Sequence, residues 1–168
     1  MNPILRGNVI SFVSRSEEQT RRLGARLGRF LQAGDLICLE GPLGSGKTCF
    51  AQGVGIGMGV KEPITSSSFV LISEYKASTG LTLYHIDFYR LQNPVEEALA
   101  IGIEEKFYGD GVCIIEWADR AKEIIPPERL WITFNYLDAH QRSILMEPKG
   151  ERYVQLLTLF KESAFGLG

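Results

Sequence analysis

The stretch EGPLGSGKTCF, residues 40–50, decides how the rest of the sequence is interpreted. From Gly41 to Thr48 it fits the pattern G-x-x-x-x-G-K-T, in which glycines let backbone N–H groups point toward phosphate oxygens. A near-continuous apolar run of strand length, residues 35–40, leads into this loop, and a helical segment follows it. Because the motif lies between a buried strand and a helix, the stretch predicts a nucleotide phosphate site.

The residues of the loop have separate predicted roles. Lys47 supplies a positive charge for the β- and γ-phosphates, and the Thr48 hydroxyl is suited to Mg²⁺. The loop amides and the positive end of the following helix face the phosphate oxygens. We therefore expect nucleotide contacts from the whole loop, namely Gly41, Pro42, Leu43, Gly44, Ser45, Gly46, Lys47, Thr48 and Cys49. The loop by itself does not distinguish a kinase from a GTPase switch or an ATPase.

Strand and helix patterns alternate along the rest of the chain, which favours an α/β fold. Residues 9–14 alternate like a strand, and Ser16 with Gln19 has the capping-box spacing for a helix that ends by Gly34. Residues 112–116 form a second buried strand candidate. We expect one domain, residues 1–168, with a P-loop NTPase-like, mostly parallel sheet flanked by helices.

Three segments refine this expectation. The helix after the loop contains Gly53, Gly55, Gly57 and Gly59, and each weakens it by up to about 1 kcal/mol relative to Ala, so its C-terminal half should fray or stop early. Residues 69–91 predict two strands joined near residues 78–80, an antiparallel hairpin inserted into the α/β order. The tail predicts strands at 130–137 and 143–148 and a closing helix at 151–160.

Composition limits the class of protein. The chain has 168 residues, enough for one domain that buries about two thirds of its unfolded surface. It is 45% hydrophobic and 23% charged with net charge −2, so nothing indicates tight nucleic-acid binding by bulk charge. The three cysteines form no C-x-x-C pair, which favours reduced, buried thiols. No apolar run reaches the roughly 20 residues of a membrane span, and we expect a cytoplasmic protein that does not contact a membrane.

Two carboxylates stand where phosphate chemistry needs them. A magnesium site requires a second anchor at the end of a neighbouring strand, and Glu116 is placed for it; the alternative is a solvated strand-end residue. In LTLYHIDFYRL, residues 81–91, the period-2 alternation puts His85 and Asp87 on one face. Asp87 could orient the attacking water or hold a magnesium-bound water. The alternative is a His–Asp pair that satisfies itself within the sheet.

Taken in order, GPLGSGKT, SSSFVLISEY, YHIDFYRL and IIEWADR resemble the bacterial TsaE family, formerly YjeE, over nearly the whole chain. The resemblance implies a P-loop ATPase with ATP/ADP and Mg²⁺ as cofactors, required for N6-threonylcarbamoyladenosine (t6A37) modification of tRNA. It further implies that the protein docks on TsaD-like and TsaB-like partners and resets that complex by ATP hydrolysis. Contact with tRNA would be indirect, through the complex.

The resemblance also implies roles for individual residues. Lys47 and Thr48 match phosphate and Mg²⁺ contacts, Glu116 matches the second Mg²⁺ anchor, and Asp87 matches an acid needed for hydrolysis; we take Lys47, Asp87 and Glu116 as the catalytic set. Trp117 matches an aromatic near the nucleotide, with a packing anchor as the alternative.

Three further residues match the nucleotide site of the family less closely. Ser68 aligns with a switch-like hydroxyl, but the chain has Ser66-Ser67-Ser68 where the family has Ser-Pro-Thr. Glu17 aligns weakly with a residue beside the nucleotide; the alternative is a first-turn acid favourable to the helix dipole. Arg142 could reach the nucleotide, and the alternative is an exposed strand-end arginine.

Other functions that use the same loop can be compared. A small-molecule kinase needs arginines on a lid over the transferred phosphate, and the sequence offers scattered Arg120 and Arg129 for it. A guanine-specific GTPase needs an N-K-x-D motif, which the sequence lacks. A nucleotide-regulated binding module with negligible turnover is close to the favoured interpretation. An ATPase acting within a complex is the preferred prediction, with the kinase as the alternative.

Overall fold

The computed structural model describes residues 3–65 and 71–166. The strands in these residues are β1 (Ile4–Arg6), β2 (Val9–Ser14), β3 (Leu36–Glu40), β4 (Ile72–Lys76), β5 (Thr82–Asp87), β6 (Val112–Glu116), β7 (Arg129–Tyr136) and β8 (Arg142–Lys149). The helices are α1 (Glu17–Gly28), α2 (Lys47–Met58), α3 (Pro94–Ala100), α4 (Ile103–Phe107), α5 (Glu151–Phe165) and the 3₁₀ helix η1 (Ala118–Ile124). The α/β class and the strands at 9–14 and 112–116 are confirmed.

The described strands form one eight-stranded sheet in the order β1-β2-β8-β7-β3-β6-β5-β4. The central neighbours β5, β6, β3 and β7 are parallel, whereas β4 is antiparallel to β5, and β7, β8, β2 and β1 are antiparallel in turn. The inserted hairpin is thus confirmed. The expectation of a mostly parallel sheet is wrong. A tight turn, closed by a hydrogen bond from the Leu137 N–H to the Gln141 carbonyl (3.0 Å), joins β7 to β8 so that the two strands are antiparallel.

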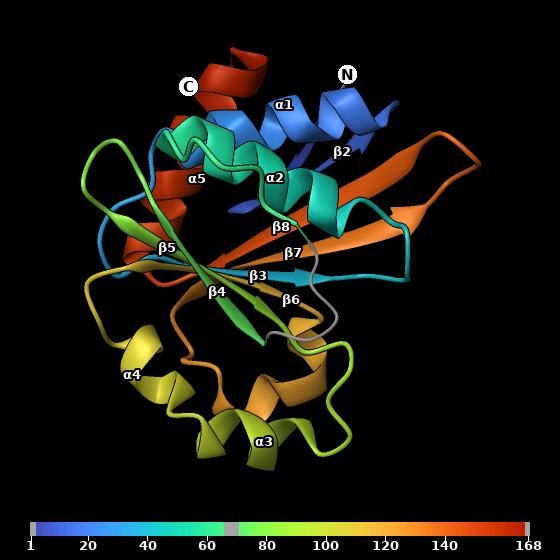
Figure 1. Ribbon diagram of the computed structural model, residues 1–168. Helices are drawn as coiled ribbons and strands as arrows, with labels where there is room; N and C mark the ends of the chain where they lie inside the picture. Colours follow the sequence, from blue (N-terminus) through green and yellow to red (C-terminus); the bar gives the residue numbers. More distant parts are fainter. Residues whose placement is uncertain (1–2, 66–70, 167–168) are drawn as a thin grey trace.

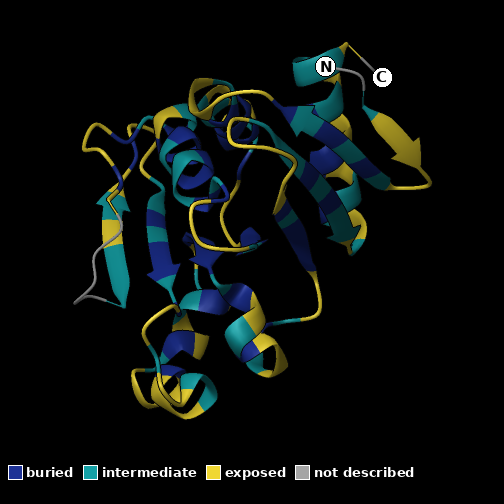
Figure 2. Cartoon of the chain, turned by 90° about the vertical axis from the view of Figure 1, so that its right-hand side faces the viewer, coloured by how far each residue is buried: buried dark blue, intermediate teal, exposed yellow. Residues whose placement is uncertain are grey.

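Helices cover both faces of the sheet. Figure 1 shows α1 and α2 on one side and α3 and α4 on the other. The central strands β3 and β6 are almost entirely buried between these layers, and Figure 2 shows the buried residues concentrated in the middle of the molecule. This double coverage explains why both strands appear in the sequence as continuous apolar runs.

The helix after the glycine loop does not stop early. It runs without a break to Met58, where Gly59 takes a left-handed conformation (φ 85°) and its N–H donates to the Gly55 and Ile56 carbonyls. The expectation of a frayed C-terminal half is therefore wrong. The packing of α2 against α1 outweighs the low helix propensity of the glycines in α2.

The glycines of α2 allow α1 to approach its backbone. A Cβ atom added at Gly53 would lie 1.9 Å from the Arg21 carbonyl oxygen, and one at Gly57 would lie 2.1 Å from that of Ala25. On α1, a Cβ atom at Gly24 would lie 2.2 Å from the Phe50 carbonyl oxygen. Glycine at these positions is thus a packing requirement of the helix pair.

The ends of α1 differ partly from expectation. Ser16 Oγ accepts the Gln19 N–H (3.0 Å), and Gln19 Oε1 reaches back to the Arg15 N–H (2.7 Å), so the predicted cap is confirmed. The helix ends at Gly28 and not near Gly34. The carbonyl of Phe30, just beyond the end, accepts from Arg152 Nη2 (2.8 Å) and not from a further helical N–H.

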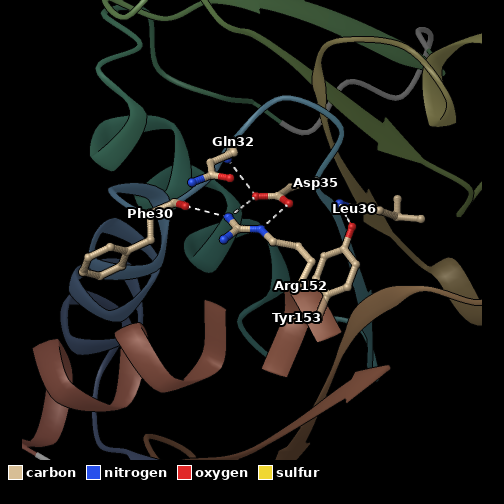
Figure 3. A network of polar contacts seen from close by, with 6 residues as sticks. All are labelled: Phe30, Gln32, Asp35, Leu36, Arg152 and Tyr153. Atoms are coloured by element: carbon tan, nitrogen blue, oxygen red, sulfur yellow. Dashed lines mark hydrogen bonds and ion pairs between the residues drawn. The ribbon is translucent and has the colours of Figure 1, made fainter. Parts of the chain in front are cut away.

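A polar network then fixes the start of β3 to α5 (Figure 3). Asp35 is buried and accepts two bonds from Arg152, at 2.9 Å from Nε and 2.6 Å from Nη2, and a third from the Gln32 N–H at 2.7 Å. The Leu36 N–H donates to the Tyr153 hydroxyl at 2.8 Å. These bonds hold the first residues of the central strand, and α5 itself extends to Phe165, five residues beyond its predicted end.

Candidate functional site

Three neighbouring parallel strands bring the predicted residues to one edge of the sheet. β3, β6 and β5 lie side by side, and in their registers Glu116 is opposite both Leu39 and Asp87. The carboxyl end of β3 therefore opens into the glycine loop beside Glu116 and Asp87. This edge is where open α/β sheets bind ligands.

A cavity of about 830 Å³ lies at this edge, within the size range of about 300–1,000 Å³ that ligand sites occupy. The predicted site residues that line it are Glu17, Leu43, Gly44, Gly46, Lys47, Thr48, Cys49, Asp87, Glu116, Trp117 and Arg142. Gly41, Pro42 and Ser45 are not among the lining residues; Ser45 is fully buried. Ser68 lies outside the residues that the structure describes.

The glycine loop curls in conformations that favour glycine. Gly44 and Gly46 have φ values of 75° and 109°, in the left-handed region. Gly41 (φ 153°) has no room for a side chain, because an added Cβ atom would lie 2.5 Å from the Phe134 carbonyl oxygen. The loop ends where α2 begins at Lys47, so the unpaired N–H groups of that helix end border the cavity.

The Lys47 ammonium lies inside the curl of the loop. Its Nζ donates to the carbonyl oxygens of Gly41 (2.6 Å) and Pro42 (2.8 Å) and lies 4.2 Å from the centre of the Trp117 ring. Burial lowers the pKa of Lys47, and the carboxylates of Glu116, Asp119 and Asp87 act in the opposite direction. A phosphate anion would favour the charged form in the same way as these carboxylates.

Glu116 is held on both of its carboxylate oxygens. The Thr48 hydroxyl donates to Oε1 at 2.7 Å, and His85 Nε2 lies 2.6 Å from Oε2. The side chains of His85 and Glu116 are each only 3% exposed. The alternative hypothesis paired His85 with Asp87; the structure gives the His85 Nε2 a partner on the next strand, Glu116.

Asp87 is half-buried at the end of β5, beside the Glu116 backbone. Its Oδ1 accepts the Tyr89 N–H at 2.9 Å, and its own N–H donates to the Leu71 carbonyl at 3.1 Å. The carboxylate therefore sits at a fixed turn that opens on the cavity. Sequence alternation placed this side chain correctly on the face of His85.

Trp117 takes an unusual backbone conformation directly after Glu116. Its φ is 60°, and among the described residues Trp117 is the only one other than glycine that has a positive φ. The ring stacks on Tyr89, with centroids 4.8 Å apart, and also faces Lys47. Strained residues concentrate at ligand sites and active sites. The ring lines the cavity and also packs against the hydrophobic core, so both of its predicted roles fit this position.

The opposite wall comes from α1 and the β7–β8 turn. Glu17 begins α1, and Arg142 begins β8, where its Nη2 donates to the Gly44 carbonyl at 3.3 Å and its guanidinium stacks over Tyr136. Both residues line the cavity, and Glu17 also lies in the first helical turn, as its alternative role requires.

Sequence reasoning missed other lining residues. They are Arg15, Ser16, Thr20, Leu71, Tyr89, Arg90, Leu91, Ala139 and His140. Arg90 follows the H-x-D-x-Y motif and could have been noticed there. Arg15 and His140 come from distant segments that only the antiparallel β2, β8 and β7 strands bring together, so no local pattern could have identified them.

The arginines considered for a kinase lid do not line the cavity. Arg120 donates to the carbonyl oxygens of Phe88 (2.9 Å) and Tyr89 and so holds the turn after β5. Arg129 is buried, with its guanidinium 4.8 Å from the Trp131 ring. Both side chains make structural contacts within the protein and are not among the cavity-lining residues.

The three cysteines are free thiols, as predicted. Cys38 and Cys113 are buried, and Cys49 at the cavity is half-buried. Burial raises the pKa of the Cys113 thiol to about 12 and raises that of Cys49 in the same direction. These thiols are therefore protonated at neutral pH and poor nucleophiles.

Comparison with known proteins identifies the family. The family model for the threonylcarbamoyl adenosine biosynthesis protein TsaE matches residues 14–144, which include the loop, Asp87, Glu116 and Arg142. The chain belongs to the TsaE family. Membership indicates a role in threonylcarbamoyladenosine biosynthesis, as the sequence resemblance had implied.

Individual relatives agree with this assignment. The tRNA threonylcarbamoyladenosine biosynthesis protein TsaE of Treponema pallidum is 42% identical over 79% of this chain and 96% of its own length. The TsaE of Bacillus subtilis is 37% identical over 83% of this chain and 85% of its own length. The crystal structure of B. subtilis YdiB is similar with a TM-score of 0.77 and 34% identity, and covers 92% of this chain and 95% of that one. The α/β architecture is thus that of a solved relative.

Among residues 3–65 and 71–166, no helix combines the length and apolar character that crossing a membrane requires.

Proposed function

We propose that this TsaE family member is a Mg²⁺-dependent ATPase that serves t6A37 modification of tRNA. It would bind a TsaD–TsaB-type complex and reset that complex by hydrolysing ATP. The observation that carries the proposal is the convergence of Lys47, Thr48, Asp87 and Glu116 on one cavity at the carboxyl edge of parallel strands. Positive charge, hydroxyl and carboxylates in this arrangement are the parts that phosphoryl transfer to water requires.

The glycine loop fits a nucleotide phosphate group. Its curled backbone and the start of α2 present N–H groups to the cavity, and anions bind at such helix ends. Lys47 donates to two loop carbonyls, which keeps its ammonium next to the place where the β- and γ-phosphates would lie. ATP and ADP are the proposed ligands, with Glu17 and Arg142 on the far wall beside them.

The donor set beside the loop fits magnesium. Thr48 Oγ1 and Glu116 Oε1 lie 2.7 Å apart, and Mg²⁺ prefers one or two such oxygen ligands together with substrate phosphates. We therefore assign Thr48 and Glu116 to hold it. When bound, the ion would neutralise charge on the phosphates during transfer.

Asp87 is the proposed residue for orienting the attacking water. Its Oδ1 accepts the Tyr89 N–H, and Asp87 lines the cavity directly opposite Glu116 on the neighbouring strand. Because Arg120 holds the carbonyls of Phe88 and Tyr89, the turn that carries Asp87 has a defined position. Positioning is the main contribution that proteins make to this reaction.

The partner proposal has support from family membership and from charge. The names of the relatives connect them to t6A biosynthesis on tRNA. With net charge −2, this chain lacks the bulk positive charge of a protein that binds tRNA by itself. Contact with tRNA through TsaD-like and TsaB-like partners is therefore the arrangement we propose.

The nucleotide part of the proposal can be tested by calorimetry with ATP. Lys47→Ala should abolish binding, because the variant removes the charge beside the phosphates. Lys61→Ala is the matched control, since Lys61 is exposed and does not line the cavity. Retained micromolar affinity in Lys47→Ala would overturn the phosphate-site assignment.

Hydrolysis is tested separately, in the presence of the partner proteins. Asp87→Asn keeps the shape of the side chain and its bond to the Tyr89 N–H, but removes the negative charge. We expect ATP binding to persist and turnover to fall. A normal rate in this variant would remove Asp87 from the mechanism while leaving the binding site intact.

A further inference from the structure

We propose that His85 is a positioning residue that fixes the Glu116 carboxylate for metal binding; this rests on the proposed Mg²⁺-dependent function. His85 Nε2 lies 2.6 Å from Glu116 Oε2, and both side chains are 3% exposed. Neither the loop motif nor the metal assignment includes this histidine. Its role follows from the geometry of the carboxylate that it contacts.

The two oxygens of Glu116 have different partners. Oε1 accepts from the Thr48 hydroxyl at 2.7 Å, on the cavity side, and Oε2 contacts His85. A carboxylate oxygen accepts hydrogen bonds, so the His85 Nε2–H is the donor to Oε2. A carboxylate held at both oxygens cannot rotate freely, so Oε1 stays beside Thr48, the other proposed metal ligand. Removal of the histidine would leave a buried oxygen without a partner.

The sheet explains why this histidine reaches this carboxylate. β5 and β6 are parallel, with His85 opposite Ile114 and Asp87 opposite Glu116. His85 is thus two residues behind the strand end that carries Asp87, and its ring spans diagonally to the Glu116 side chain. Among the described residues, those that line the cavity do not include His85, so it acts through Glu116 rather than on a ligand.

A matched pair of variants separates positioning from a merely structural role. His85→Gln places an amide N–H near the position of Nε2 and can keep the bond to Oε2. His85→Asn is also an amide, but its shorter side chain places the N–H near the position of Nδ1, too far back to reach. Both variants remove the ring and its packing, so a structural role predicts similar losses for the two.

The measurement is the affinity for the non-hydrolysable ATP analogue AMP-PNP by calorimetry, with MgCl₂ and with a chelator in its place. We expect His85→Asn to bind AMP-PNP without metal as the wild type does. Its Mg²⁺-linked gain in affinity should fall by about 10- to 100-fold, the usual effect of losing a residue that orients a metal ligand. His85→Gln should retain most of that gain.

The possible results separate a failure of the positioning role of His85 from a failure of the proposed Mg²⁺-dependent function. A wild type that binds AMP-PNP equally with and without Mg²⁺ would overturn the metal-dependent function itself. A normal Mg²⁺-linked gain in His85→Asn, or an equal loss in both variants, would overturn the role of His85 and leave the function standing. If His85→Asn did not fold, the glutamine variant alone would decide, because the inference requires it to retain the gain.

Discussion

The contact between α1 and α2 can be tested by adding a single methyl group at Gly53. A Cβ atom there would lie 1.9 Å from the Arg21 carbonyl oxygen and 2.9 Å from the Ala25 nitrogen, both backbone atoms of α1. Backbone cannot rotate away, so the helices must separate. Overpacking of this kind costs about 1–3 kcal/mol, and the better helix propensity of Ala returns at most about 1 kcal/mol of that. We expect Gly53→Ala to be destabilised.

Gly55→Ala is the matched control on the same helix. The nearest atoms to its Cβ atom would be side-chain atoms, Ile64 Cδ1 at 2.6 Å and Cγ1 at 3.2 Å, and not the backbone of α1. This variant gains the same helix propensity without forcing the helices apart. Thermal and urea unfolding would compare the two, since each 1 kcal/mol shifts Tm by about 2–4 °C in a protein of this size. Equal stability of the two variants would refute the argument that glycine is required for backbone approach.

The remaining predictions concern the site, the β3 anchor and the buried thiols. Glu116→Gln should bind ATP but lose most turnover, and an unchanged hydrolysis rate would exclude Glu116 from the mechanism. Asp35→Ala should lower the free energy of unfolding in urea by about 1–3 kcal/mol, because Arg152 loses both bonds to the carboxylate; unaltered stability would contradict this. Burial raises the pKa of Cys113 from 9.0 to about 12, so the folded state holds this proton more tightly than the unfolded chain. The resulting stability is complete below pH 9 and falls above it by about 1.4 kcal/mol per pH unit, and Cys113→Ala should flatten the decline in urea titrations.

Local sequence patterns predicted the parts of this protein that local chemistry determines. The loop at Lys47 and Thr48 depends on adjacent residues, and Glu116 ends a strand whose burial is evident from its apolar run. The face of Asp87 follows from period-2 alternation. These positions therefore agree with the structure without any knowledge of the topology.

Features that depend on pairing between distant segments could not be predicted in the same way. From the sequence alone, Gly53 and Gly57 indicate a weak helix. Their role in packing becomes evident only when the backbone of α1 is seen to lie against them. The bond from His85 to Glu116 crosses between strands, and His140 and Arg15 line the same cavity only because the antiparallel half of the sheet brings their segments together. The antiparallel half forms because β8 returns beside β7 and then pairs with β2. No local sequence pattern specifies that second pairing.

Reconstituted tRNA modification tests the central claim most directly. The assay would contain TsaD-type and TsaB-type proteins, the activated threonylcarbamoyl adenylate, tRNA and ATP, and would count t6A formed per complex over time. Our account predicts many turnovers with the wild-type chain and a single turnover with Lys47→Ala or without the chain. Multiple turnovers that continue with Lys47→Ala, or in the absence of this protein, would contradict it.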